Sequence, residues 1–293
     1  MKVLLTGRNG QVGSEIIGLQ DTCSFELITT GKDMLDIGEP DQVKQLMDDV
    51  QPDLVINAAA YTEVDRAETD AETAERVNHL GAAYLASACN QADIPLLHIS
   101  TDYVYDGRKE IPYRENDSTS PNSVYGRSKL AGDRAVATHP QHLILRTAWI
   151  FGSHGQNFVK TMLRLGAVRD EIAVVNDQHG APTWSRDIAE TLIRITNRYA
   201  DAQPIQWGIY HYTGCPSTTW YGFAQAIFQQ AVDTGILQTT PTLIPIRSDQ
   251  YPTAAIRPKH STLNCYKIKS TFGITPADWQ TGLRQVLLNW NKL

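Results

Sequence analysis

The sequence predicts an α/β fold built on a doubly wound parallel sheet, and three observations lead to this prediction. A short apolar run, residues 2–6, opens the chain and ends at a glycine-rich turn. Further short apolar runs follow at 25–30, 53–60, 95–100 and 142–146. Longer stretches of helical character separate them. Since strands that alternate with helices form parallel sheets, we expect a Rossmann-like doubly wound parallel sheet with a smaller interleaved α/β domain.

Length and composition limit the classes of protein to consider. The chain has 293 residues, enough for one large domain or a large and a small one. A formal net charge of −6 argues against general affinity for nucleic acid or an anionic membrane. Four scattered cysteines without metal-ligand spacing indicate reduced thiols and no zinc site. With no signal peptide and no apolar run of about 18 residues, we expect a cytoplasmic protein.

The first turn carries three glycines, Gly7, Gly10 and Gly13, in the spacing GxxGxxG. A tight turn, close approach of the backbone to a pyrophosphate, and close packing of the helix on the strand all favour glycine. The helix that begins near Gln11 and Val12 directs its N-terminal amides towards the phosphates. These five residues are therefore predicted to bind a dinucleotide cofactor.

The end of the second strand predicts which dinucleotide is bound. A site that prefers NAD carries an acidic residue there, which holds the ribose 2′-hydroxyl. This chain has Thr30 and Lys32 instead, with Arg8 nearby. Thr30 can hydrogen-bond a hydroxyl or a phosphate, and the two cations can neutralise a 2′-phosphate, although Lys32 could equally be a solvated loop charge. We predict a modest preference for NADPH, with NADH still used.

Two more strand ends are predicted to reach the same site. Small residues after the third strand let the backbone lie against the cofactor, in the stretch Ala59, Ala60, Tyr61 and Thr62. Thr101 follows the fourth strand, and ligands of doubly wound sheets bind at the carboxyl ends of the strands. Thr101 is therefore a candidate hydroxyl donor to a substrate carbonyl.

Tyr125 and Lys129 stand four residues apart in a predicted helix at about 123–137. This spacing brings a phenol and an ammonium to one helical face, because a helical turn takes about 3.6 residues. In isolation such a pair could be an ordinary surface pair. Together with the glycine turn, however, YxxxK is the signature of a short-chain dehydrogenase/reductase.

The elements become shorter and mixed after residue 148. Helices are predicted at 157–165 and 187–199, strands at 172–176 and 209–213, and a helix cap and start at 218–221. Residues 1–148 with parts of about 177–240 are expected to form a dinucleotide-binding domain. Residues of about 149–176 and 241–293 are expected to form a substrate-binding lobe. Trp149 leaves the fifth strand where a substrate ring could rest, although a core tryptophan would look the same.

Several stretches along the chain resemble one family. They include TGRNGQVG at 6–13, NAAAYTEVDRAE at 57–68, STDYVYDG at 100–107, YGRSKLAGD at 125–133 and RTAWIFG at 146–152. Others are VVNDQHGAPTW at 174–184, TTWY at 218–221 and RPKHSTL at 257–263. The chain resembles, over its whole length, the dTDP-4-dehydrorhamnose reductases, which are extended short-chain dehydrogenases/reductases. The resemblance implies NADPH- or NADH-dependent reduction of the 4-keto group of dTDP-6-deoxy-L-lyxo-4-hexulose to dTDP-L-rhamnose, for rhamnose-containing cell-surface polysaccharide.

The resemblance also implies roles for single residues. Tyr125 would donate the proton, Lys129 would favour the phenolate and bind the nicotinamide ribose, and Thr101 would stabilise the developing oxyanion. Asp36 and Ile37 would flank the adenine of the cofactor. Asp102, Tyr103 and Trp149 would contact the sugar, and Arg257 would face the diphosphate.

Alternatives stay open from the sequence alone. A nucleotide-sugar dehydratase or epimerase has the same architecture, but a dehydratase carries Thr-Asp-Glu where this chain has Thr101, Asp102 and Tyr103. Relatives of these reductases also serve as a non-catalytic regulatory subunit. Some family members are described as magnesium-dependent, and Glu15 and Glu190 are candidates on exposed helix faces, without ligand spacing. The sequence leaves magnesium and a homodimer open.

Overall fold

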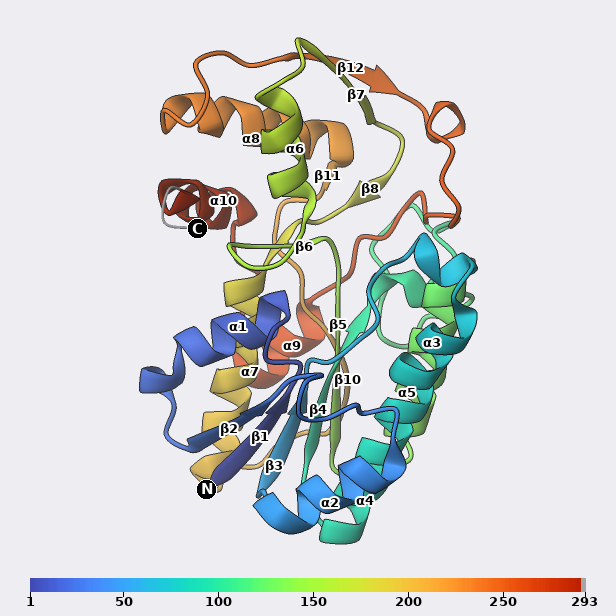
Figure 1. Ribbon diagram of the computed structural model, residues 1–293, viewed down its shortest axis with the longest axis vertical. Coiled ribbons are helices and arrows are strands. Elements are labelled where there is room, and N and C mark those ends of the chain that lie inside the picture. Colours follow the sequence, from blue (N-terminus) through green and yellow to red (C-terminus); the bar gives the residue numbers. More distant parts are fainter. Residues whose placement is uncertain (291–293) are drawn as a thin grey trace.

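A six-stranded parallel sheet forms the centre of the large domain in the computed structural model, which describes residues 1–290 (Figure 1). In sheet order the strands are β10 (Gly208–His211), β5 (His142–Thr147), β4 (Leu96–Thr101), β3 (Leu54–Asn57), β1 (Lys2–Thr6) and β2 (Glu26–Thr30). The chain builds β2 on one side of β1 and β3 on the other, so the strand order reverses between β1 and β3. This confirms the predicted doubly wound sheet, whose ligand crevice lies at that reversal.

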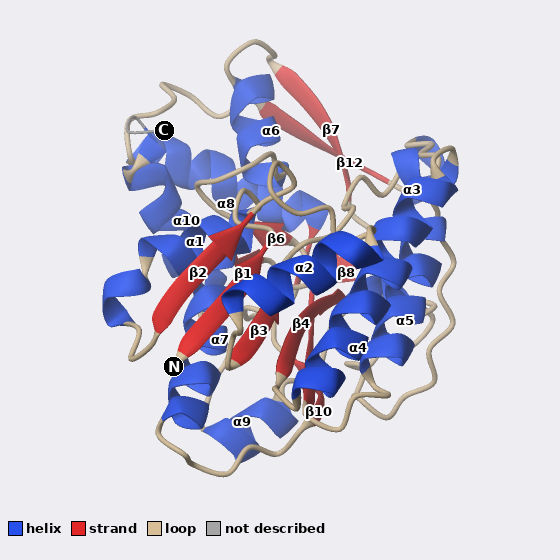
Figure 2. Ribbon diagram, turned by 60° about the horizontal axis from the view of Figure 1, so that its bottom comes forward, coloured by secondary structure: helices blue, strands red, loops and turns tan. Residues whose placement is uncertain are grey.

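Helices cover both faces of the sheet (Figure 2). One face carries α1 (Gln11–Gly18), α7 (Ser185–Ala200) and α9 (Tyr266–Phe272), and the other carries α2 (Pro40–Val50), α4 (Ala82–Ala92) and α5 (Val124–Val136). Along β1, Val3 and Leu5 pack into the first layer and Leu4 into the second. Successive side chains of a strand point to opposite faces. Burial on both faces explains why these strands are apolar runs rather than alternating patterns.

The segment before α4 is not a single continuous α-helix. A short helix, α3 (Ala71–Glu75), leads into a π-helical turn (Arg76–Gly81), and α4 follows directly. Asn78 lies in this turn, almost fully buried, and its amide hydrogen-bonds both backbone groups of Tyr61 and the hydroxyl of Ser128. The turn therefore connects the β3 exit to α5.

A second hydrophobic core lies above the carboxyl edge of the sheet (Figure 1). It is formed by α6 (Phe158–Gly166), α8 (Trp220–Asp233) and α10 (Trp279–Leu288). Three strand pairs accompany them: β7 (Glu171–Val175) with β12 (Thr242–Ile246), β8 (His179–Gly180) with β11 (Thr218–Thr219), and β6 (Ile150–Phe151) with β9 (Thr183–Trp184). Thr219 caps α8, as the sequence predicts, by accepting from the Gly222 amide.

The boundaries between the domains stay a prediction, but two packing facts bear on them. Helix α8 belongs to the second hydrophobic core. Helix α9 packs against the sheet, although residues 241–293 were expected to form the substrate-binding lobe. The chain thus crosses between the two cores several times, as expected for an interleaved lobe.

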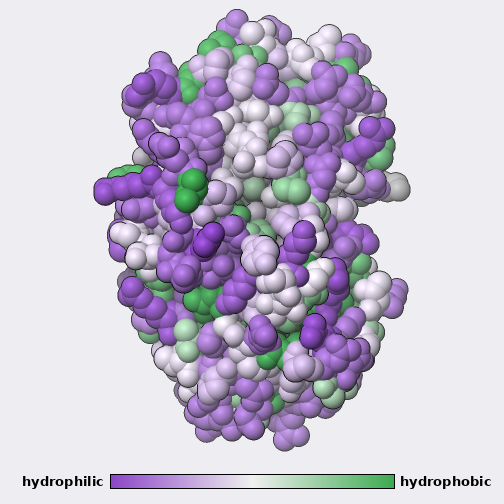
Figure 3. Space-filling model, turned by 180° about the vertical axis from the view of Figure 1, so that it is seen from behind, coloured by the Kyte–Doolittle hydropathy of each residue, from purple (hydrophilic) through white to green (hydrophobic). Residues whose placement is uncertain are grey.

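Hydrophilic side chains dominate the face shown in Figure 3, where hydrophobic residues form only scattered small patches. Within residues 1–290, no helix has the length and apolarity needed to cross a membrane.

Candidate active site

A cavity of about 560 Å³ opens at the carboxyl ends of β1, β2 and β3. At its floor Gly7 has a positive φ of 77°, and a Cβ atom there would lie 2.5 Å from the Ala59 amide nitrogen. A Cβ atom at Gly13 would lie 2.2 Å from the Gly7 carbonyl oxygen. Only glycine fits either position. The turn therefore has the tight geometry that a pyrophosphate-binding loop requires.

Most of the predicted cofactor residues line this cavity, namely Gly7, Gly10, Thr30, Lys32, Asp36, Ile37, Ala59, Ala60 and Tyr61. Gln11, Val12, Gly13 and Thr62 are not among the lining residues. The Val12 side chain packs in the core under the sheet, so only its backbone amide can face a phosphate. The binding roles stay predictions.

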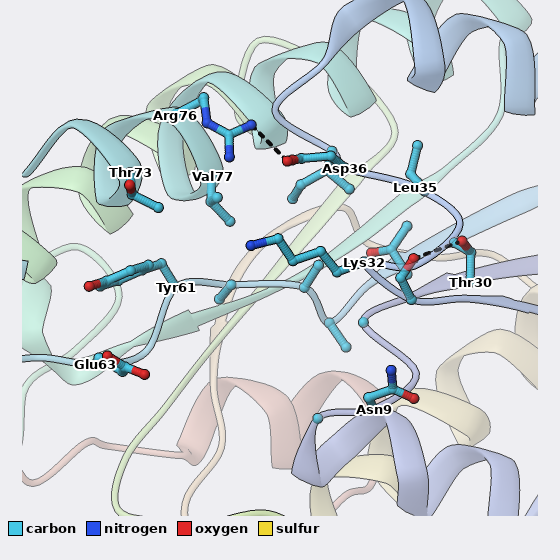
Figure 4. Close-up of a pocket in the computed structure, with 18 of the residues that line it drawn as sticks. Asn9, Thr30, Lys32, Leu35, Asp36, Tyr61, Glu63, Thr73, Arg76 and Val77 are labelled. Atoms are coloured by element: carbon cyan, nitrogen blue, oxygen red, sulfur yellow. Dashed lines mark hydrogen bonds and ion pairs between the residues drawn. The ribbon is translucent and has the colours of Figure 1, made fainter. Parts of the chain in front are cut away.

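The cations predicted near the 2′-phosphate differ in their surroundings. Arg8 forms an ion pair with Asp33 at 2.5 Å, so its charge is already balanced. Lys32 extends into the cavity and forms no ion pair in the part of the chain that the structure describes (Figure 4). The Thr30 hydroxyl is buried and donates to the neighbouring Gly31 carbonyl at 3.4 Å. Lys32 is therefore the cation best placed for a 2′-phosphate.

Asp36 lies at the rim of the cavity and is held by Arg76 from the π-helical turn, at 2.8 Å (Figure 4). Burial opposes its ionisation. Hydrogen bonds from Arg76 and from the Gly38 amide outweigh burial and lower the pKa of Asp36. The carboxylate is thus ionised and fixed at the side of the cavity where the adenine was expected.

Thr101 at the end of β4 and the first turns of α5 bring the predicted catalytic residues together. Tyr125 is 9 % exposed and Lys129 only 2 %, so the pair is not an ordinary surface pair. Burial raises the pKa of Tyr125 well above its ordinary value, and a hydrogen bond with Thr101 acts in the opposite direction. Tyr61, which lines the cavity, packs in the same cluster as Tyr125. The trio therefore adjoins the cofactor cavity.

Lys129 has an unusual environment for a cation. Burial lowers the pKa of Lys129 to about 8, against the opposing influence of the Asp133 carboxylate. Its ammonium donates to the Ile99 carbonyl at 2.8 Å. Lys129 can therefore change its protonation state close to neutral pH, which an exposed lysine does not.

Asp102 and Tyr103 form the short 3₁₀ turn that follows Thr101. Burial raises the pKa of Asp102 to about 6, although hydrogen bonds with Ser261 and Thr101 act against it. Its Oδ2 has no hydrogen-bond partner within residues 1–290. The Tyr103 ring packs edge-on against Tyr125, with centroids 5.4 Å apart. Asp102 thus has an unpaired acceptor beside Thr101, and its role towards the sugar stays a prediction.

Trp149 is held by a second tryptophan. Its backbone is left-handed, with φ of 48°, and its ring stacks on Trp220 with centroids 3.6 Å apart. A Cβ atom at Gly180 would lie 2.4 Å from the Trp149 ring. A left-handed bulky residue is strained, and such strain concentrates at functional sites. Contact of Trp149 with a sugar stays a prediction.

The Arg257 guanidinium, predicted to bind a diphosphate, is already paired with a carboxylate in this structure. Its guanidinium forms two hydrogen bonds with the carboxylate of Asp65, at 3.0 and 2.6 Å, and Asp65 also accepts from the Ala255 amide. Asp65 follows β3, so this ion pair joins the 255–257 segment to the large domain. A diphosphate would have to share or replace Asp65, and the role of Arg257 towards it stays a prediction.

Of the two magnesium candidates, Glu15 does not lie on the exposed face expected of it, whereas Glu190 is exposed as expected. Glu15 is buried at 8 % exposure and accepts from Ser185, and burial raises its pKa. Glu190 pairs with Arg186. No group of three or more His, Cys, Asp or Glu within residues 1–290 could hold a metal ion. Nothing in the structure or its relatives supports magnesium.

Three functional candidates were not predicted from the sequence. Asp65 holds Arg257, and Asn57 and His98 form a buried polar line that ends at Lys129. Asn57 and His98 lie inside predicted strands, where a single polar residue forms no sequence pattern that would indicate a functional role. Only their side-by-side placement in neighbouring strands reveals them.

Comparisons with known proteins show the family of this chain. The family model described as "RmlD substrate binding domain" matches residues 1–291. A dTDP-4-dehydrorhamnose reductase of Aggregatibacter actinomycetemcomitans is 45 % identical over 287 residues, covering 97 % of this chain and 98 % of the relative.

Two solved structures are also similar. That of a dTDP-4-dehydrorhamnose reductase from Clostridium acetobutylicum has a TM-score of 0.91 and 36 % identity, with both chains fully covered. That of a dTDP-4-dehydrorhamnose reductase from Bacillus anthracis, in complex with NADP, has a TM-score of 0.89 and 33 % identity, covering 98 % of this chain and 99 % of the other. With its glycine turn, its cavity and its buried tyrosine–lysine pair, this chain belongs to the dTDP-4-dehydrorhamnose reductase family, the family of the RmlD substrate binding domain.

Proposed function

We propose that this chain reduces the 4-keto group of dTDP-6-deoxy-L-lyxo-4-hexulose to give dTDP-L-rhamnose, with NADPH as the favoured cofactor and NADH also used. One observation carries the proposal. Thr101 is hydrogen-bonded to Tyr125, Lys129 lies one turn further along α5, and all three are buried beside a cavity whose glycine turn fits a dinucleotide. The relative from Bacillus anthracis, described in complex with NADP, supports the choice of cofactor.

The chemistry assigns a task to each of these side chains. When bound, a reduced nicotinamide would supply the hydride to the sugar C4, and the residues of this chain would then meet negative charge on the former carbonyl oxygen. Tyr125 donates a proton to that oxygen, and the Thr101 hydroxyl hydrogen-bonds it as the charge develops. Lys129, as an ammonium, holds the cofactor ribose and stabilises the phenolate that Tyr125 becomes. Because the site is buried, these interactions act with little screening by water.

Asp102 and Arg257 are proposed to hold the two ends of the nucleotide sugar. The free Oδ2 of Asp102 can accept from a sugar hydroxyl next to the reacting carbon. Arg257 lies on the segment that reaches down from the upper core to Asp65, and it would contact the diphosphate. Trp149 would contact the sugar on the side of the second hydrophobic core. We further propose that the enzyme acts in the cytoplasm, as a homodimer, as part of nucleotide-sugar biosynthesis.

The test is a reaction with defined substrates. The protein is mixed with the 4-keto-L-sugar nucleotide and NADPH, the absorbance of the reduced nicotinamide is followed, and the product is separated by chromatography. We expect one sugar reduced for each NADPH consumed and no consumption without the sugar. If the protein binds NADPH but consumes none with this sugar, it is a binding subunit or acts on another substrate.

A further inference from the structure

A line of buried polar side chains crosses three neighbouring strands behind Lys129. Thr6 ends β1, Asn57 ends β3 and His98 lies in β4, each only 1 % exposed. They occupy matched register positions, Thr6 opposite Asn57 and Asn57 opposite His98. Buried polar groups in a parallel sheet are costly unless they are hydrogen-bonded. The proposed reaction gives none of the three a task.

The orientation of the Asn57 amide follows from its partners. Its Oδ1 accepts from the Ala59 backbone amide at 3.1 Å and from the Thr6 hydroxyl at 2.7 Å. A backbone N–H can only donate, so the atom facing it must be the oxygen. The Nδ2 of Asn57 then faces Nδ1 of His98 at 3.0 Å. Because an amide nitrogen only donates, Nδ1 of His98 must be an unprotonated acceptor.

His98 is therefore fixed in one state. With Nδ1 accepting, the neutral ring carries its single proton on Nε2. A doubly protonated ring would place an N–H against the N–H of Asn57. In agreement, burial and then the charge of Lys129 hold the pKa of His98 well below its ordinary value. The Nε2–H group points towards Lys129, with Nε2 3.5 Å from Nζ.

This arrangement gives Lys129 too few acceptors for an ammonium. Its three N–H groups find one protein acceptor within residues 1–290, the Ile99 carbonyl. The Nε2–H of His98 offers the ammonium no lone pair but could donate to a neutral amine. Asp133, one turn further along α5, acts in the opposite direction, and it is itself bound by Arg146 of β5. The remaining neighbour, Tyr125, is a neutral phenol near pH 7.

We propose that His98, held by Asn57 as the tautomer with its proton on Nε2, is a positioning residue that leaves the Lys129 ammonium short of an acceptor until the cofactor ribose supplies one. This rests on the proposed function only in taking Lys129 as the ribose ligand. Cofactor binding then favours the protonated lysine. Below pH 8 the lysine is already protonated in the free protein, and above it a proton must be taken up. Cofactor affinity should therefore fall as the pH rises through about 8.

The tautomer can be measured without any enzyme activity. Nitrogen-15 NMR of histidine-labelled wild-type protein should show His98 with Nδ1 unprotonated and Nε2 protonated throughout the neutral pH range. The His98 signals are identified by their loss in His98→Phe. In Asn57→Asp the carboxylate keeps the Ala59 and Thr6 contacts but needs a donor from the ring, so the proton should move to Nδ1. Wild-type His98 with its proton on Nδ1 would overturn the proposal.

The consequence for the cofactor is measured by NADPH titration across pH. Asn57→Asp turns Nε2 of His98 into an acceptor for Lys129, so the pH midpoint of the affinity loss should rise by roughly one to two units. His98→Phe removes the Nε2–H that faces the Lys129 ammonium, and it should raise the pH midpoint by less than Asn57→Asp does. The control is His142→Phe, whose ring contacts the His139 backbone carbonyl at the start of β5 and makes no hydrogen bond or ion pair with Lys129 within residues 1–290.

Each result of the titration decides something. Equal midpoints in wild type, Asn57→Asp and His142→Phe would refute the role of His98, even if the sugar is reduced at a normal rate. If His98→Phe does not fold, because the Asn57 amide loses its acceptor, Asn57→Asp still gives the answer. Failure of the proposed function would instead show as absent sugar reduction with the NMR result unchanged.

Discussion

Burial has opposite consequences for the two side chains proposed to do the chemistry. It raises the pKa of the Tyr125 phenol and lowers the pKa of Lys129 to about 8, because each time the charged form is disfavoured. Near neutral pH the site therefore holds a neutral acid and a lysine close to losing its proton. The sequence could predict the pair from its spacing, but the depth of burial depends on Tyr61, Tyr103 and the sheet.

A first prediction concerns Lys129. The ammonium form is present below pH 8 and is lost as the pH rises through about 8. Wild-type turnover should therefore decline on that alkaline side. Lys129→Met removes this group, so we expect weaker cofactor binding. The alkaline limb of the pH–rate profile should move to higher pH, because only the Tyr125 phenol then titrates. The measurements are a pH–rate profile and an NADPH titration. A profile that does not move, with unchanged NADPH affinity, would contradict the role of Lys129.

At the scale of elements, helix α5 is fixed to the sheet by a buried ion pair. Asp133, one turn after Lys129, accepts from Arg146 of β5 at 3.0 Å, and both side chains are 3 % exposed or less. Arg146 also donates to the Tyr105 hydroxyl, which contacts His211 of β10. This network connects the helix that carries Tyr125 and Lys129 to two strands.

The second prediction tests this connection. Arg146→Met leaves the Asp133 carboxylate buried and unpaired, so the free energy of unfolding should fall by about 3–5 kcal/mol. Urea denaturation measures it. The matched control is Arg186→Met, whose ion pair with Glu190 is exposed and should contribute about 0–1 kcal/mol. Similar small losses in both variants would mean that α5 is held by apolar packing instead.

Elements differ in how far the sequence could predict them. The six strands of the central sheet are apolar runs that end in glycine or polar residues, so their starts were predicted to within one residue and their ends to within three. The two-residue strands β6, β8, β9 and β11 could not be, because two residues carry no period. The π-helical turn at Arg76–Gly81 continues a helical pattern and is fixed by Asn78 contacts that only the fold creates.

On the scale of the whole molecule, charge at the mouth of the cavity should decide between cofactors. No acidic residue ends β2, and Lys32 extends into the cavity (Figure 4). An exposed cation near a phosphate contributes about 1 kcal/mol or less, which is roughly a fivefold effect. We predict a modest preference for NADPH over NADH that salt weakens.

The measurement is kcat/KM for both cofactors at low and high salt. Lys32→Ala should remove most of the preference, and Lys44→Ala on the exposed face of α2 should not. A clear NADH preference, or an NADPH preference that salt leaves intact, would mean that Lys32 is a solvated loop charge.

A fourth prediction concerns a reaction that should be absent. Elimination of water from dTDP-glucose needs a second acid after the catalytic threonine and Asp102, and Tyr103 occupies that position. The Tyr103 ring instead packs on Tyr125, and burial raises its pKa. Incubation with dTDP-glucose and NAD should give no 4-keto-6-deoxy sugar. Chromatographic detection of that product would overturn the assignment as a simple reductase.

The most direct test of the reductase mechanism is a comparison of Tyr125→Phe with wild type. The change removes the proton donor and keeps the ring that packs on Tyr103. With the 4-keto-L-sugar nucleotide and saturating NADPH, kcat should fall by a factor on the order of 10²–10⁴, while NADPH affinity stays at the wild-type value. Tyr266→Phe, at an exposed position, serves as the control and should be fully active. Near-wild-type turnover in Tyr125→Phe would contradict the mechanism.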